Sequence, residues 1–137
     1  MPQDKNKKTG LDSGGRALLI AALAADKKAS DVLVLQMEWL TSFTDYFVIC
    51  SGSSTTQVKT ISDYIVETLK AKGIRPMGLE GVSNAKWVLI DFGDVVVHIF
   101  EEETRAFYEL EKLWMDAPHL EVPSLSAKDT QAEKEEG

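Results

Sequence analysis

The sequence predicts an α/β domain in which a mixed sheet of about five strands has helices packed against it. Short runs of β-branched and aromatic residues predict strands, longer runs of helix-forming residues predict helices, and turn-forming residues separate them. The expected order is α-β-β-α-β-β-β-α. The chain has 137 residues, of which 44% are hydrophobic. This is enough for one core of ordinary size, so a multidomain enzyme is not expected.

The first helix and the first two strands are predicted within the first 50 residues. Residues 16–28 are rich in Ala and Leu, with leucines four positions apart, and predict a helix. Residues 31–37 and 45–50 are short and rich in β-branched and aromatic residues, and predict strands. Cys50, the only cysteine, ends the second of these runs. We expect it to be a buried core residue, and no disulfide can form within one chain.

The second helix is predicted to begin after a break at residues 51–53. Ser54 and Gln57 have the spacing of a capping box. Apolar residues then follow at helical intervals as far as Lys72 and Gly73, namely Val58, Ile61, Ile65 and Leu69. Residues 76–79 predict a short edge strand, because a proline cannot donate a hydrogen bond to a neighbouring strand.

A β-hairpin is predicted for residues 87–92 and 95–100, joined by a two-residue type II′ turn at Gly93 and Asp94. Because side chains alternate along a strand, such a turn sorts the hairpin into two faces. The face expected to lie in the core comprises Val88, Ile90, Phe92, Val95, Val97 and Ile99. The other face is expected to stay partly wet until a partner covers it, and comprises Trp87, Leu89, Asp91, Val96, His98 and Phe100.

One closing helix is predicted for residues 101–115. Its apolar stripe, expected to face the core, comprises Ala106, Phe107, Leu110, Leu113 and Trp114. Tyr108 points away from this stripe, and either sits exposed or contacts a partner, since tyrosine is enriched at binding hot spots. Residues 1–14 and the acidic residues 118–137 are predicted to be flexible tails around a domain of residues 15–117.

Charge and hydropathy restrict the environment and the partners. The net charge of −7 argues against nucleic-acid binding through the overall field, because phosphate affinity comes mainly from Lys and Arg, and it favours a basic protein partner. The longest apolar run, residues 17–25, is far shorter than the roughly 20 residues that span a membrane. No signal sequence is evident. A cytoplasmic protein without a membrane contact is therefore expected.

Two patterns suggest catalysis, and neither is complete. The triplet Asp91-Phe92-Gly93 holds Mg²⁺ in protein kinases, but the other kinase motifs are missing. Gly52-Ser53 follows a buried strand and opens a helix, where nucleotidyltransferases bind phosphate. Those enzymes also need two carboxylates at positions i and i+2 of a strand, and the segment after the helix offers only Glu80.

Metal and general-base sites are equally weak. If Phe92 and Gly93 formed the loop instead, Asp91 and Asp94 would face each other across the hairpin and could bind a cation. His98 has no nucleophile at a supporting position, so we expect it to be hydrogen-bonded to Asp91 or to a partner. The prediction is a protein that is not an enzyme and holds no cofactor or metal. A residual nucleotidyltransferase or nucleotide-binding protein stays as the alternative.

Ordered motifs between residues 18 and 117 carry a more specific signal. They are residues 45–54 with Gln57 and Val58, Glu80-Gly81, residues 87–100, Glu102 with Arg105, and residues 108–114. Together they resemble the Iojap family, the ribosomal silencing factors. Ala85 stands where many members have glycine, and another small residue there should leave the turn intact.

This resemblance implies a nucleotidyltransferase-like fold that has lost the catalytic carboxylates. It implies a factor that binds the large ribosomal subunit through ribosomal protein L-fourteen and sterically blocks association with the small subunit. Translation would thereby be repressed in stationary phase or nutrient limitation. A homodimer when free and a minor contact with ribosomal RNA are also expected. The expected partner-binding residues are Trp87, Leu89, Asp91, Asp94, Val96, His98, Phe100 and Tyr108.

Overall fold

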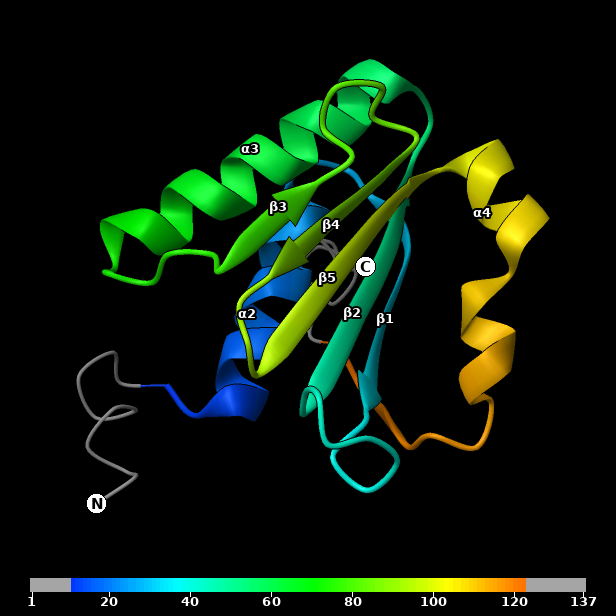
Figure 1. Cartoon of the computed structure of the whole chain (residues 1–137). Coiled ribbons are helices and arrows are strands. Elements are labelled where there is room, and N and C mark those ends of the chain that lie inside the picture. The colour runs from blue at the N-terminus through cyan, green and yellow to red at the C-terminus, as the bar shows by residue number, and fades with distance from the viewer. Residues whose placement is uncertain (1–10, 123–137) are drawn as a thin grey trace, which may run out of the picture.

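A six-stranded mixed sheet organises residues 11–122, the part of the chain that this computed structural model describes (Figure 1). Its strand order is β3-β4-β5-β2-β1-β6. The strands are β1 (Ser30–Gln36), β2 (Tyr46–Gly52), β3 (Gly78–Glu80), β4 (Trp87–Asp91), β5 (Val95–Glu101) and β6 (His119–Leu120). β2 and β5 run parallel, and the other neighbouring strands run antiparallel. The predicted α/β class with a mixed sheet is confirmed.

β6 was not predicted, because two residues are too short to show a strand pattern. It pairs antiparallel with β1, so the boundary of the predicted tail at residue 118 falls too early. The N-terminal boundary at residue 14 is also misplaced, because the first described helix begins at Ser13. The other residues of the predicted tails, 1–10 and 123–137, lie outside the described part of the chain.

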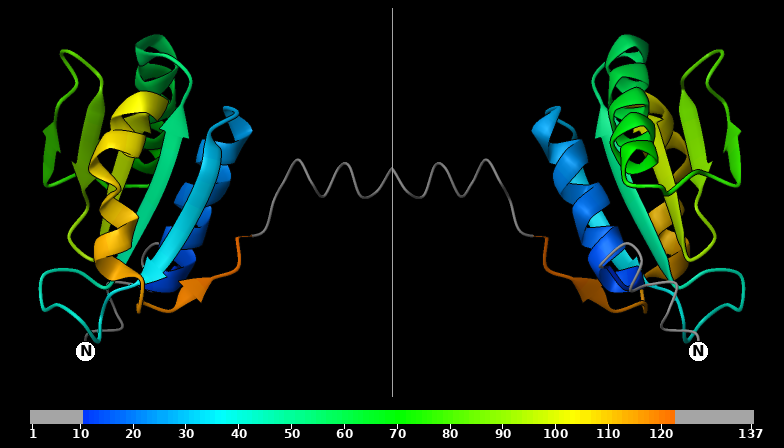
Figure 2. Two further views of the ribbon diagram at one scale, coloured as in Figure 1. Left: turned by 90° about the vertical axis from the view of Figure 1, so that its right-hand side faces the viewer. Right: turned by 90° about the vertical axis from the view of Figure 1, so that its left-hand side faces the viewer.

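Two helices cover one face of the sheet, and the final helical segment covers the other (Figure 2). The first face carries α2 (Ser13–Asp26) and α3 (Thr55–Ala71), which enclose the larger core cluster. Half of the predicted capping box is present: the Ser54 hydroxyl accepts a hydrogen bond from the Gln57 backbone N–H at 3.1 Å, but the Gln57 side chain accepts the backbone N–H of Ser53 and not that of Ser54. Among the described residues, no helix is both long and apolar enough to cross a membrane.

The β4–β5 hairpin has the predicted turn and register. The backbone N–H of Phe92 donates to the carbonyl of Val95 at 2.9 Å, which leaves Gly93 and Asp94 as the loop. Gly93 has a φ of +92°, whereas the φ of Asp94 is not positive, as a type II′ turn requires. All six residues of the predicted core face are buried. Because Phe92 is paired, the alternative loop that would bring Asp91 and Asp94 opposite each other is excluded.

The single closing helix predicted for residues 101–115 is wrong. The segment forms α4 (Glu102–Tyr108) and a 3-10 helix, η1 (Leu110–Trp114), separated by Glu109 in the left-handed conformation with φ of 48°. Because of this break, residues before and after Glu109 do not share one helical periodicity, and a helical wheel drawn through residues 101–115 predicts the wrong buried face. Leu110 and Trp114 do pack against the second core cluster, but Phe107 and Leu113 are 79% and 71% exposed.

Candidate functional site: an aromatic groove

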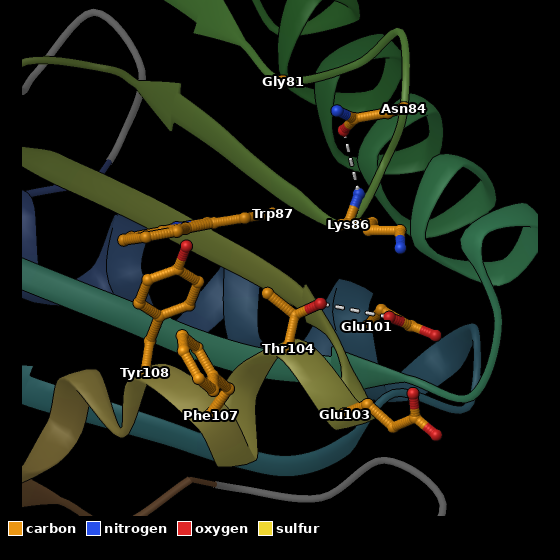
Figure 3. Close-up of a pocket in the computed structure, with 9 residues that line it drawn as sticks. All are labelled: Gly81, Asn84, Lys86, Trp87, Glu101, Glu103, Thr104, Phe107 and Tyr108. Carbon is orange, nitrogen blue, oxygen red and sulfur yellow. Dashed lines mark hydrogen bonds between the residues drawn. The ribbon is translucent and has the colours of Figure 1, made fainter.

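A groove of about 660 Å³ lies between the start of β4 and α4 (Figure 3). We call it the aromatic groove, because three of its lining residues are Trp87, Phe107 and Tyr108. The other lining residues are Gly81, Asn84, Lys86, Glu101, Glu103 and Thr104. The groove therefore brings together residues of the hairpin and of the last helix, two segments for which partner contacts were predicted separately.

The aromatic rings of the groove contact one another. The ring of Tyr108 lies 5.1 Å from that of Trp87, centroid to centroid, and 4.9 Å from that of Phe107 (Figure 3). Tyr108 is 54% exposed and Phe107 is 79% exposed, so both are open to a partner. Phe107 was predicted to face the core, and this is wrong, because α4 ends at Tyr108 and the apolar stripe that linked Phe107 to Leu110 is interrupted there.

His98 lies beneath Trp87 and differs from its prediction. The indole Nε1–H of Trp87 donates to His98 Nδ1 at 3.1 Å, which places the histidine proton on Nε2 when the ring is neutral. Only 5% of His98 is exposed, and this burial lowers its pKa to about 4. The predicted bond to Asp91 is absent, because the Asp91 carboxylate instead accepts the backbone N–H of Gly93 at 2.8 Å.

Other residues of the predicted partner surface are partly engaged within the chain. Phe100 is fully buried, so the expected wet face is wrong for Phe100 and His98; the final helical segment covers that side of the sheet. Asp94 forms an ion pair with Arg16 at 2.8 Å, at the start of α2. Leu89 and Val96 remain half-buried on the sheet face, as does Asp91.

The charge of the groove is acidic overall, since Glu101 and Glu103 line it together with one cation, Lys86. The carboxylate of Glu101 accepts the Thr104 hydroxyl at 3.1 Å. A groove with aromatic walls and an excess of carboxylates is complementary to an apolar or basic surface.

Arg105 supports the groove, a role that was not predicted from the sequence. Its guanidinium is buried and donates through Nη1 to the Asp31 carbonyl and to the Ser51 hydroxyl, both at 2.8 Å. Its Nε also contacts the carboxylate of Glu111 at 3.3 Å. These bonds attach α4 to the ends of β1 and β2 and so place Tyr108 opposite Trp87. Hydrophobic periodicity cannot predict a buried arginine, because it places charged residues on the exposed face of a helix.

The segment at Gly52 and Ser53 is used for helix capping rather than arranged as a phosphate cradle. The backbone N–H of Ser53 donates to the side chain of Gln57 at 2.6 Å, so that donor is already occupied. A Cβ at Gly52 would lie 3.0 Å from a methyl group of Val58, so the glycine allows close packing of α3.

Metal and thiol chemistry find no support in the described residues. No group of three or more His, Cys, Asp or Glu side chains within residues 11–122 is placed to hold a metal ion. Cys50 is fully buried as predicted, and burial raises the pKa of its thiol to about 12. A thiol with this pKa is a poor nucleophile, because the thiolate is the reactive form.

Comparisons with known proteins agree on one family. The family model described as "Ribosomal silencing factor during starvation" matches residues 12–137. Ribosomal silencing factor RsfS of Bacillus subtilis is 47% identical over 100 residues, which are 73% of this chain and 85% of that protein. "Mitochondrial assembly of ribosomal large subunit protein 1" of Mus musculus is 37% identical over 99 residues, which are 70% of this chain and 43% of that protein.

Solved structures show the same fold. A crystal structure of a Chromobacterium violaceum protein matches with a TM-score of 0.74 at 33% identity and covers 76% of this chain and 87% of that chain. A crystal structure of a Bacillus halodurans protein matches with a TM-score of 0.68 at 43% identity and covers 77% of this chain and 96% of that chain.

Proposed function

Because the chain belongs to the ribosomal silencing factor family, we propose that it silences ribosomes by binding the large subunit and blocking association with the small subunit. The action is steric and not enzymatic. The contact is made to ribosomal protein L-fourteen, with a minor contact to ribosomal RNA. The free protein is a cytoplasmic homodimer.

The aromatic groove is the observation that carries this proposal. Trp87 and Tyr108 meet there from two different elements, and their rings are partly exposed without an enzyme-like constellation beside them. Trp and Tyr are enriched among the residues that contribute most to protein–protein affinity. The carboxylates of the groove and the net charge of −7 both favour a basic protein surface over nucleic acid.

The surface beside the groove extends the proposed contact along the sheet. On the sheet, Leu89 of β4 pairs with His98 of β5, and Val96 of β5 pairs with Asp91 of β4. Leu89 and Val96 are half-buried. We assign direct contact to Trp87, Tyr108, Leu89 and Val96. The other four predicted residues support this surface without direct contact, because their side chains are bonded within the chain or buried; they are Asp91, Asp94, His98 and Phe100.

Cosedimentation with isolated ribosomal subunits tests the proposal. The wild-type protein should travel with large subunits and not with small ones. Trp87→Ala or Tyr108→Ala should weaken binding by roughly 30- to 1,000-fold, which corresponds to about 2–4 kcal/mol for truncation of an interface anchor. Trp39→Ala is a matched control, because Trp39 is 76% exposed and does not line the groove.

Two outcomes would contradict different parts of the proposal. A wild-type protein that does not sediment with large subunits would contradict the function itself. Binding that survives both groove substitutions but is lost in Trp39→Ala would contradict the choice of surface and move it to the β1–β2 connection.

A further inference from the structure

The hydrogen-bonding group of Trp87 is directed into the protein and not toward the groove. Its Nε1–H donates to His98 Nδ1 at 3.1 Å, while its ring lies 5.1 Å from that of Tyr108 in the groove wall. A partner that enters the groove therefore meets the faces and edges of the indole and finds the N–H already paired.

The acceptor ring is itself held in place. Phe47 contacts the His98 ring edge-on with a centroid distance of 4.7 Å, and Phe100 stacks with it at 6.4 Å and an interplanar angle of 15°. Burial keeps the ring neutral near pH 7, so Nδ1 retains the lone pair that the indole needs. The position of the imidazole thus determines the orientation of the indole.

Stability alone does not account for a histidine at this position. The Nε2 atom of His98 is buried and has no hydrogen-bond partner among residues 11–122. A buried donor without an acceptor destabilises the folded state. Leucine would fill the same apolar surroundings without this cost, but it could not accept the bond from Trp87.

We propose that His98 is a positioning residue that fixes the indole of Trp87 so that its ring, and not its N–H, is presented to the partner. This inference rests on the proposed function, because it concerns the same groove. It identifies the partner group against Trp87 as one that stacks on the ring and offers no hydrogen-bond acceptor to the indole.

Nuclear magnetic resonance of the ¹⁵N-labelled full chain tests the positioning without any ribosome. The chain has three tryptophans and therefore three indole N–H signals, and the one that disappears in Trp87→Phe belongs to Trp87. In wild type the Trp87 signal should be protected from solvent exchange. His98→Leu should remove the protection, and His98→Asn should preserve it, because the asparagine Oδ1 replaces Nδ1 as acceptor. An unchanged signal in a folded His98→Leu would overturn the proposal.

Binding to large subunits tests the consequence. His98→Leu should weaken binding about fivefold, the value of one ordinary hydrogen bond, and His98→Asn should stay within about twofold of wild type. In a Trp87→Phe background His98→Leu should have no further effect. Equal losses in both backgrounds would overturn the proposal. Failure of wild type to bind would instead refute the proposed function and leave the resonance test in force.

Discussion

Replacing Arg105 by methionine tests whether this buried cation holds the α4 wall of the aromatic groove in place. Its guanidinium makes two hydrogen bonds of 2.8 Å, to the carbonyl of Asp31 and to the hydroxyl of Ser51, and an ion pair of 3.3 Å with Glu111. Methionine keeps the length and the apolar packing of the side chain but none of these bonds.

The expected loss of stability is about 3.5 kcal/mol. Each hydrogen bond to a charged group contributes about 1.5 kcal/mol or more, and two such bonds are lost. The ion pair adds about 0.5 kcal/mol, because Glu111 retains 32% of its side-chain exposure. With a urea dependence of about 1.5 kcal/mol per molar, the midpoint of unfolding should fall by roughly 2 M.

Urea unfolding followed by circular dichroism measures this shift, and hydrogen exchange in α4 shows whether the helix has detached. Lys112→Met is the matched control, since Lys112 pairs with Glu109 at 3.5 Å but both side chains are more than half exposed. It should change stability by less than about 0.5 kcal/mol. An Arg105→Met protein with the wild-type midpoint and wild-type exchange in α4 would refute the assigned role.

Two further predictions concern a glycine and the pH dependence of stability. Gly81→Ala should lower the free energy of unfolding by about 3 kcal/mol, because φ is +81° and a Cβ would collide with the Trp87 carbonyl. Gly73→Ala should lower it by only about 1 kcal/mol, because φ is +85° but the space around a Cβ is open. Similar urea midpoints for the two variants would contradict this. Burial lowers the pKa of His98 from 6.5 to about 4, so the unfolded chain binds a proton that the folded chain does not. Stability is therefore fully present above pH 6.5 and declines toward pH 4, with a contribution of about 3 kcal/mol from this group. His98→Leu should lack that part of the decline, and an unchanged pH profile in this variant would argue against a buried neutral histidine.

The hairpin shows what local sequence rules can determine. A two-residue turn fixes the parity of pairing, and one apolar face then has to lie in the core, so Gly93 and Asp94 were enough to predict which side of the sheet each residue faces. Trp87 was correctly placed on the face opposite the main core. That placement needed no knowledge of the rest of the fold.

The depth of burial on the second face could not be predicted in the same way. Phe100 and His98 alternate with core residues just as Trp87 does, yet they are buried while Trp87 is only partly covered. The difference depends on where α4 and η1 cross the sheet. Their path depends on the left-handed Glu109 and on Arg105, and neither contributes to an apolar periodicity.

Two buried polar side chains thus determine the shape of the aromatic groove from opposite sides. His98 orients Trp87 on the sheet, and Arg105 attaches the helix that carries Tyr108. Both lie on the face opposite α2 and α3, and neither belongs to the larger core cluster. Loss of either contact should therefore open the groove while the α2–α3 side of the domain stays folded. Because these contacts lie outside the larger core, a single substitution can alter the groove while the domain stays folded. His98→Leu should therefore weaken binding to large subunits in a protein that remains folded.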